Sequence, residues 1–198
     1  MAYKKRLDMD IQSKWNNKHQ ERMEELTEPA SNARLMKLSA YLNGGNALDM
    51  ACGLGGNSLF LSRNGYNVQA IDISDVAIGY LQDLALKNNL PIAARIADLT
   101  SLDKYSWDNQ SFDMIVDTYY LDRKVFPLIK KLLKAGGYFF METYYQASLT
   151  AKQGVSDQYK LKPKELLNVF GDWQVLYYEE NEHEGRQTIF CRKCKQGN

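Results

Sequence analysis

The sequence predicts an α/β fold, a doubly wound and mostly parallel sheet with helices on both faces. β-rich runs alternate with helical stretches through most of the chain, a pattern typical of parallel strands joined by right-handed crossovers. The first strand runs into the glycine-rich turn Gly53-Leu54-Gly55-Gly56, which opens a helix. At 198 residues the chain has room for one such domain, and not for a second of comparable size.

Residues 1–44 are predicted to form an N-terminal helical cap, and residues 45–198 the core of the same domain. Residues 10–28 combine helix-forming charged and amide residues with four apolar side chains, and Pro29 closes the segment. Residues 31–43 carry an apolar stripe at helical spacing, and a glycine pair ends that helix. The apolar residues of these two helices are Ile11, Trp15, Met23 and Leu26, then Leu35, Leu38 and Leu42.

The core is predicted to alternate strands with helices. Strands are expected over residues 46–51, 67–72, 92–97, 112–117 and 137–142. Helices are expected over residues 56–64, 75–88 and 123–134. Two further β-rich runs near the C-terminus, 172–180 and 187–192, flank a polar loop that contains Gly185 and predict a hairpin.

Composition limits the partners of the chain. The sequence has 25 Lys and Arg against 24 Asp and Glu, and a net charge of +1 provides no general attraction for nucleic acid. No apolar run approaches the length of a membrane span, and the charged N-terminus lacks a signal-peptide core, so we expect a cytoplasmic protein without a membrane partner. Three cysteines fit a reducing compartment. The pair Cys191 and Cys194 lacks a second ligand pair, so no metal site is predicted.

The glycine-rich turn is predicted to bind a nucleotide. Glycine lets backbone approach a ligand closely, and the N–H groups that begin the following helix are free to bind it. Asp72 ends the next strand, where a carboxylate can accept both hydroxyls of a ribose. NAD-binding enzymes share this layout, but their fingerprint requires another glycine three residues after Gly55, and Ser58 stands there.

Residues Asp49 to Gly55 resemble the first motif of class I S-adenosylmethionine-dependent methyltransferases, an acidic residue and small residues followed by Cys-Gly-x-Gly. Ala51 stands where that family usually has glycine. Three further motifs resemble the family in order, at Arg95 to Leu99, Phe112 to Tyr120 and Leu132 to Glu142. The resemblance implies a Rossmann-like sheet of seven strands, to which the C-terminal hairpin adds an antiparallel strand. It implies S-adenosylmethionine as cofactor and S-adenosylhomocysteine as product.

The resemblance also implies roles for single residues. Asp72 would hold the ribose diol, Asp98 the adenine amino group with Leu99 against the ring, and the turn at Gly53 the methionine moiety. Taken alone, Asp98 fits a helix N-cap equally well. The expected cofactor-binding residues are Asp49, Ala51, Cys52, Gly53, Gly55, Asn57, Asp72, Ile73, Asp98, Leu99 and Asp117.

The implied reaction is an in-line displacement of a methyl group from a sulfonium, which alignment in a dry pocket accelerates. Four tyrosines near the ends of the fourth and fifth strands can face the sulfonium or the acceptor, or else pack within a lid. They are Tyr119, Tyr120, Tyr144 and Tyr145. The run from Asp117 to Tyr120 lacks the two prolines of base-amino methyltransferases, which favours a small-molecule acceptor over nucleic acid.

The tail is similar to the tellurite-resistance and thiopurine-methyltransferase-like branch, on residues 161–173, 178–180 and 186–192. That branch commonly has arginine where Gly56 stands. It methylates small soft nucleophiles such as thiols or chalcogen oxyanions, and His183, Arg186 or Arg123 could form a cationic site for an oxyanion. A solvated hairpin loop is the alternative for the first two. The catalytic candidates are Tyr119, Tyr120, His183 and Arg186.

Two other functions stay open at this point. The enzyme could modify a protein or RNA, which a basic surface patch beside the site would favour. The chain could also be a catalytically inactive protein that binds the cofactor and acts as a partner. The sequence leaves open the natural acceptor, the oligomeric state, the role of the two C-terminal cysteines, and whether the N-terminal helix closes over the site.

Overall fold

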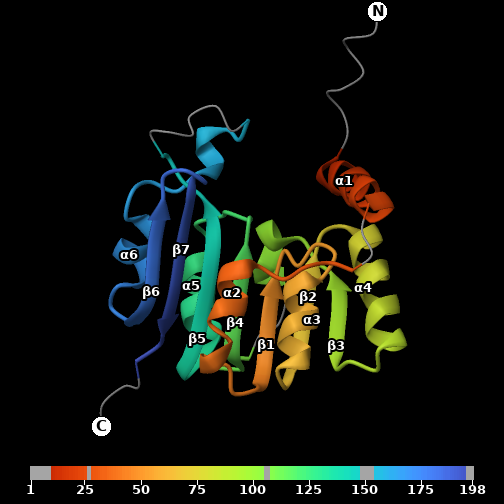
Figure 1. Ribbon diagram of the computed structural model, residues 1–198, viewed down its shortest axis with the longest axis horizontal. Coiled ribbons are helices and arrows are strands. Elements are labelled where there is room, and N and C mark those ends of the chain that lie inside the picture. Colours follow the sequence, from red (N-terminus) through yellow and green to blue (C-terminus); the bar gives the residue numbers. More distant parts are fainter. Residues whose placement is uncertain (1–9, 26–27, 105–107, 148–153, 195–198) are drawn as a thin grey trace, which may run out of the picture.

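The computed structural model describes residues 10–25, 28–104, 108–147 and 154–194. Its centre is one sheet of seven strands in the order β3-β2-β1-β4-β5-β7-β6 (Figure 1). The strands are β1 (Gly45–Met50), β2 (Tyr66–Asp72), β3 (Ile92–Ile96), β4 (Phe112–Thr118), β5 (Leu133–Tyr144), β6 (Gln174–Asn181) and β7 (Arg186–Arg192). The first five are parallel, and β7 pairs antiparallel with both β5 and β6.

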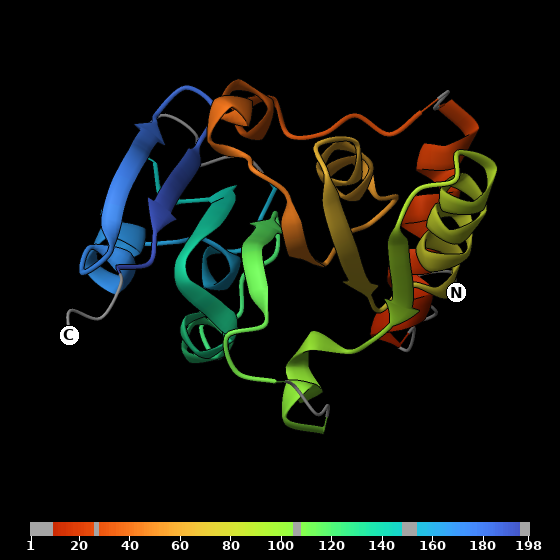
Figure 2. The same cartoon turned by 90° about the horizontal axis from the view of Figure 1, so that it is seen from below.

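Helices cover both faces of the sheet, with α2, α3 and α4 on one face and α5 and α6 on the other (Figure 2). They are α1 (Ile11–Glu25), α2 (Ala33–Lys37), α3 (Gly56–Arg63), α4 (Asp75–Lys87), α5 (Val125–Leu132) and α6 (Glu165–Phe170). Short 3-10 turns lie at η1 (Ser39–Tyr41), η2 (Leu99–Lys104) and η4 (Asp157–Tyr159). The predicted fold class, a doubly wound and mostly parallel seven-stranded sheet with an antiparallel C-terminal strand, is confirmed.

Each face of the sheet has its own apolar core. On one face, α5 and α6 contribute side chains such as Ile129 and Phe170, which pack with Phe139 of β5. On the other face, Leu35 of α2 and Leu59 of α3 lie in a second buried cluster. The central strands β1 and β4, which are covered on both sides, each have four consecutive buried residues, whereas β2 begins with alternating buried and exposed residues.

Two elements differ from their predicted bounds. The helix expected over residues 31–43 is only the short α2, followed by η1, because Asn32 caps its start by accepting the N–H groups of Arg34 and Leu35 and the last turn is 3-10. The fifth strand begins four residues earlier than expected, at Leu133. The glycine pair at 136–137 lies inside β5, beside a register shift against β4, and so belongs to a strand irregularity instead of a turn.

The N-terminal helix α1 agrees with the prediction over residues 11–25, while Leu26 and the first nine residues lie outside the described part of the chain. The helix lies beside α4, at the end of the sheet toward which the parallel strands point (Figure 1). Among its described side chains the most deeply buried is His19, with 3% exposed, whereas Ile11 is 61% exposed. Trp15 and Met23 are half-buried, so the expected apolar residues contribute only part of the contact that this helix makes.

Within the described residues, no helix is long and apolar enough to cross a membrane.

Candidate cofactor and acceptor site

The candidate site lies where β1, β2 and β4 end side by side. β1 pairs in parallel with both neighbours, so the three carboxyl ends reach the same edge of the sheet. The order of the strands reverses here, because β2 and β3 follow outward on one side of β1 and β4 and β5 on the other. Ligands of doubly wound sheets bind at such a reversal. Asp49, Asp72 and Asp117 lie at or next to these strand ends.

The turn after β1 requires unusual backbone angles. The angle φ is +50° at Ala51, +52° at Gly53 and +88° at Gly55, which is the left-handed region that favours glycine. A β-carbon at Gly55 would also overlap the side chain of Leu81 in α4. The turn therefore depends on glycine for its angles and its packing, and it directs the free N–H groups of α3 toward the carboxyl edge.

Ala51 is the one member of this turn that pays a steric cost for its angle. A residue with a β-carbon is destabilised by about 1–2 kcal/mol in the left-handed region, whereas the extra freedom of glycine in the unfolded chain costs about 0.5–1 kcal/mol. We expect Ala51→Gly to raise the free energy of unfolding by up to about 1 kcal/mol in a urea titration. Ala77→Gly, inside α4, should instead lower it by about 1 kcal/mol. Equal losses in both variants would contradict this account of Ala51.

Asp72 is anchored at the end of β2. Its Oδ2 accepts the N–H of Gly53 and its Oδ1 accepts the N–H of Ser74, both at 2.9 Å. Only 6% of the residue is exposed. A carboxylate has about four acceptor positions. Asp72 can therefore accept two more hydroxyl groups while it stays fixed to the turn.

Two further acids beside the turn are fully buried. The Oδ2 of Asp49 accepts the hydroxyl of Ser58 at 2.6 Å, whereas its Oδ1 and both oxygens of Asp117 have no hydrogen-bond partner among the described residues. Burial raises the pKa of Asp49 to about 7. Burial, with the added charge of Asp49, raises the pKa of Asp117 well above its usual range. Buried carboxyl oxygens without partners are costly, so this pair is suited to a positively charged ligand.

Residues 30–34, which we call the crossing segment, run over the start of α3 (Figure 1). The hydroxyl of Ser31 and the N–H of Asn32 both donate to Oδ1 of Asn57, at 3.0 and 2.9 Å. Nδ2 of Asn57 donates to Thr118 at the end of β4, at 3.0 Å. The side chain of Asn57, expected to bind cofactor, is thus engaged by the protein itself and joins three elements around the turn.

The crossing segment also explains the glycine at position 56. A β-carbon on Gly56 would overlap the backbone carbonyl of Ala30, which cannot move as a flexible side chain could. The branch that the tail resembles commonly has arginine at this position. An arginine side chain here would overlap the crossing segment. Its absence follows from how the N-terminal residues are routed.

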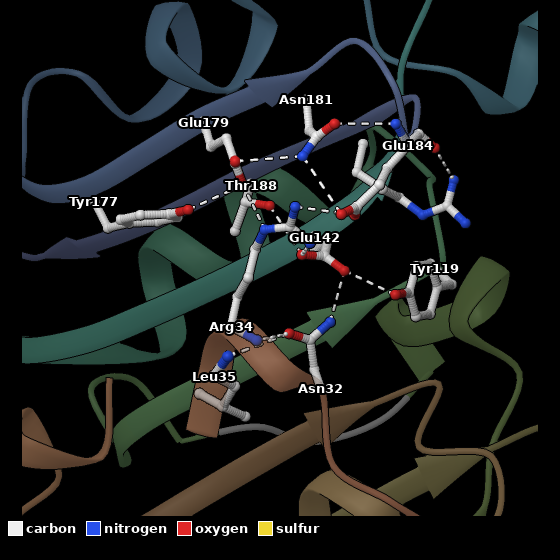
Figure 3. A network of polar contacts seen from close by, with 11 residues as sticks. Asn32, Arg34, Leu35, Tyr119, Glu142, Tyr177, Glu179, Asn181, Glu184 and Thr188 are labelled. Atoms are coloured by element: carbon white, nitrogen blue, oxygen red, sulfur yellow. Dashed lines mark hydrogen bonds and ion pairs between the residues drawn. The ribbon is translucent and has the colours of Figure 1, made fainter. Parts of the chain in front are cut away.

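A buried acid that the sequence did not single out, Glu142 of β5, gathers four donors (Figure 3). Its Oε1 accepts Nδ2 of Asn32 and the hydroxyl of Tyr119, both at 2.7 Å. Its Oε2 accepts Nη1 of Arg34 at 3.1 Å and the hydroxyl of Thr188 at 2.9 Å. Only 1% of Glu142 is exposed. This carboxylate therefore ties the crossing segment to β7 and to the residue that follows β4.

Arg34 extends the same network to the hairpin. Besides Glu142 it contacts Glu179 of β6 and, at 2.9 Å, Glu184 in the turn between β6 and β7 (Figure 3). These carboxylates hold the pKa of the Arg34 guanidinium above its ordinary value despite its partial burial. The residues of the network are far apart in the sequence, and no local motif marks them.

Tyr119, Tyr144 and Arg186 form a cluster beside the ends of β4 and β5. The guanidinium of Arg186 lies 3.8 Å from the ring centroid of Tyr144 and 5.2 Å from that of Tyr119, and the two rings are 6.0 Å apart. Tyr119 is 49% exposed and has a φ of +60°. Burial of its hydroxyl and the bond to Glu142 raise the pKa of Tyr119 to about 12. At neutral pH this phenol is a hydrogen-bond donor and not a base.

The other candidates from the sequence lie apart from this cluster. Tyr120 is half-buried against the core and Tyr145 is buried within it. His183 is exposed in the turn between β6 and β7. Arg123 binds Glu165 through two hydrogen bonds of 2.6 and 2.9 Å and so joins the start of α5 to α6. Of the three predicted cations, Arg186 is the one that the structure brings to the tyrosines.

Four other residues predicted to bind the cofactor are Asp98, Leu99, Ile73 and Cys52. Oδ1 of Asp98 accepts the N–H and the hydroxyl of Thr100, at 2.9 and 2.7 Å, which is the local cap considered above as the alternative role. Leu99 beside it is buried and Ile73 half-buried. Burial raises the pKa of the Cys52 thiol well above its usual value. Contact of these residues with the cofactor stays a prediction.

Two other places on the molecule lack the features of a reaction site. A hollow of about 440 Å³ opens at the opposite edge of the sheet, beside Asn46, Asn67 and Pro91, and no ionisable side chain lines it. The sulfur of Cys191 lies 3.9 Å from the carbonyl oxygen of Phe139. The sulfur of Cys194 lies 3.7 Å from the carbonyl oxygen of Asp172. Within the described ranges, no three histidine, cysteine or acidic side chains are placed to hold a metal ion.

The sequence is similar to that of known proteins over most of its length. Residues 14–191 match the family described as "Tellurite resistance protein TehB". The chain is 32% identical over 141 residues to "Hemagglutinin 1" of Eikenella corrodens, a match that covers 67% of this chain and 45% of that protein. It is 30% identical over 155 residues to the "Probable S-adenosyl-L-methionine-dependent methyltransferase TehB" of Haemophilus influenzae, covering 71% of this chain and 50% of that protein. The chain spans about half the length of these curated relatives.

The fold is also similar to that of a solved structure. The crystal structure of TehB from Haemophilus influenzae superposes with a TM-score of 0.72 at 23% identity, over 86% of this chain and 65% of that one. The two proteins therefore share the arrangement of strands and helices that builds the carboxyl edge.

Proposed function

The chain belongs to the TehB family, and on that premise we propose that it transfers a methyl group from S-adenosylmethionine to a small anionic acceptor. This is the family that the sequence resembled. The curated relative from Haemophilus influenzae is named as a probable methyltransferase that depends on S-adenosylmethionine, which is the enzyme class and the cofactor that the sequence predicted. The observation that best supports the activity is the anchored carboxylate of Asp72 beside the glycine-rich turn, at the reversal of strand order.

The residues of the carboxyl edge fit S-adenosylmethionine in charge and in hydrogen bonding. Asp72 has acceptor capacity for the two ribose hydroxyls. The cofactor carries a sulfonium and an ammonium group, and the unpartnered oxygens of Asp49 and Asp117 are suited to positive charge. A cation beside them favours their ionised forms, which burial alone disfavours. We assign the turn at Gly53 to the methionine moiety and Asp117 to its positive groups.

S-adenosylmethionine supplies an activated methyl group that leaves its sulfur as the acceptor attacks. The chain contributes position and surroundings to this displacement. Tyr119 and Tyr144 present aromatic rings beside the strand ends, and rings of this kind attract cationic groups. The network around Glu142 fixes Tyr119 in its orientation, so that acceptor and methyl group meet in one geometry. A proton acceptor is needed only when the acceptor carries a proton.

The preference for an anion rests on Arg186. Among the ion pairs of the described residues, Arg34 binds three glutamates and Arg123 binds Glu165, whereas Arg186 pairs with no carboxylate. Its hydrogen bond from Nη1 goes to the carbonyl oxygen of Glu184, at 3.0 Å. A guanidinium that stacks on two rings and lacks a carboxylate partner can bind the acceptor's negative charge. Thiolates and chalcogen oxyanions such as selenite and tellurite are acceptors of this kind.

The test of this function is transfer of a labelled methyl group from S-adenosylmethionine to a panel of thiols, selenite and tellurite. We expect turnover of at least one anionic acceptor by the wild type. Arg186→Gln should raise the KM of that acceptor about tenfold or more, because a hydrogen bond to a charged group contributes about 1.5–3 kcal/mol.

The matched control is Arg192→Gln, at the far end of the same strand, where the guanidinium stacks on Tyr138 and away from the site. This variant should keep the wild-type KM. An unchanged KM in Arg186→Gln would remove Arg186 from the acceptor site. Cofactor binding by the wild type without transfer to any acceptor would favour the catalytically inactive alternative.

A further inference from the structure

The most deeply buried described side chain of α1 is a histidine for which no role was predicted. His19 is 3% exposed, and its Nδ1 has no hydrogen-bond partner among the described residues. A buried polar nitrogen without a partner is costly, and native proteins rarely keep one without a reason. A site for a ligand atom is such a reason.

His19 faces the glycine-rich turn. Its Cε1 lies 3.2 Å from the place that a β-carbon on Gly53 would occupy, and its two ring nitrogens lie 4.0 Å from it. Burial lowers the pKa of His19, with the carboxylate of Asp72 acting in the opposite direction. The neutral imidazole that results can carry its proton on Nδ1 and donate it to a ligand held by the turn.

Other contacts fix this histidine in place. The side-chain amide of Asn16 donates to Asp75 at 2.6 Å and accepts the hydroxyl of Ser74 at 2.7 Å, which joins α1 to the start of α4. The ring of Trp15 stacks on His19 with 5.9 Å between the centroids. The bonds of Asn16 therefore hold α1 against α4, and the ring of Trp15 packs against the imidazole.

The charges around the turn indicate which group His19 would bind. The carboxyl edge is lined by Asp49, Asp72 and Asp117, which repel an anion. The methionine moiety of the cofactor nevertheless ends in a carboxylate, which needs hydrogen-bond donors. On α1, Nζ of Lys18 lies 4.6 Å from the centroid of the Trp15 ring that stacks on His19, so this helix brings a positive charge close to His19.

We propose that His19 binds the carboxylate of the cofactor's methionine moiety through Nδ1, so that α1 completes the cofactor site. The inference rests on the proposed use of S-adenosylmethionine. It names an N-terminal residue, outside the core motifs, as a determinant of cofactor binding. It also predicts discrimination between ligands that have and ligands that lack the amino-acid portion.

The test is calorimetric titration of the full chain with S-adenosylhomocysteine and with 5′-methylthioadenosine, which has the same nucleoside but no carboxylate. His19→Phe keeps a ring against Trp15 and removes both ring nitrogens, including Nδ1. We expect it to weaken S-adenosylhomocysteine binding about tenfold or more, the usual effect of losing a bond to a charged group, and to leave methylthioadenosine within twofold. His19→Asn, whose amide can take the place of Nδ1, should recover part of the loss.

Lys14→Ala, an exposed position on the same helix, is the control and should change neither affinity. Urea unfolding of His19→Phe should show no loss of stability, because no hydrogen bond of Nδ1 within the described protein is removed. Unchanged S-adenosylhomocysteine affinity would overturn the inference, and so would an equal loss for both ligands, which would indicate that the residue only holds α1. If the wild type bound no adenosyl ligand, the proposed function itself would be wrong.

Discussion

Glu142→Ala is expected to lower the free energy of unfolding by about 3–5 kcal/mol, the cost of removing one partner from a buried ion pair. The carboxylate is the common acceptor for Asn32, Arg34, Tyr119 and Thr188, and all four lose a bond at once. Urea unfolding followed by circular dichroism measures the loss. The variant should also be slower in methyl transfer, because the hydroxyl of Tyr119 would lose its anchor.

The control for this prediction is Glu184→Ala, which removes a second carboxylate from the same guanidinium. The side chain of Glu184 is 53% exposed, against 2% for Glu142, so its pairing with Arg34 is screened by water. We expect a change below about 1 kcal/mol. Similar losses in the two variants would mean that burial of Glu142 does not set the strength of the network.

Asp72→Ala is expected to weaken S-adenosylmethionine binding by about 1.5–3 kcal/mol, or about 10- to 150-fold in Kd, the range for hydrogen bonds to a charged group. Two bonds to the ribose would be lost, together with the anchor that Asp72 provides for the N–H of Gly53. Calorimetric titration with S-adenosylmethionine, S-adenosylhomocysteine and NAD in parallel measures the loss and tests the choice of cofactor. The wild type should bind the two sulfur compounds and not NAD.

Asp83→Ala serves as the matched control, since Asp83 is an exposed acid on α4. It should bind S-adenosylmethionine with wild-type affinity. A folded Asp72→Ala variant that binds as tightly as the wild type would displace Asp72 from the ribose. Binding of NAD alone would overturn the cofactor assignment as a whole.

The parts of the fold that local sequence determines were predictable. The glycine-rich turn, the acid that ends β2 and the alternation of strands and helices depend on residues close in the chain, and they occur at or within a few residues of the predicted bounds. The early start of β5 was not predictable, because it follows from pairing with β4 and not from the residues around the glycine pair.

The candidate site was predictable only where strand ends define it. Asp49, Asp72 and Asp117 were placed from the sequence because parallel strands end at a common edge. Glu142 was missed because two of its partners in the crossing segment are 108 and 110 residues away, and no spacing rule joins them. His19 was missed because a single histidine in a polar helix gives no periodic signal. Its position beside the glycine-rich turn is known only from the fold, in which it lies against Gly53.

The contact between Ala30 and Gly56 constrains how relatives of this chain can diverge. The backbone of Ala30 fills the volume that a side chain at position 56 would need, so position 56 must stay glycine while the crossing segment follows this path, whichever residue stands at position 30. A protein with arginine at the equivalent of position 56 must lead its N-terminal residues along another route. Sequences of this family should therefore fall into two groups, in which the residue at that single position goes together with a different length or composition of the segment before the first strand.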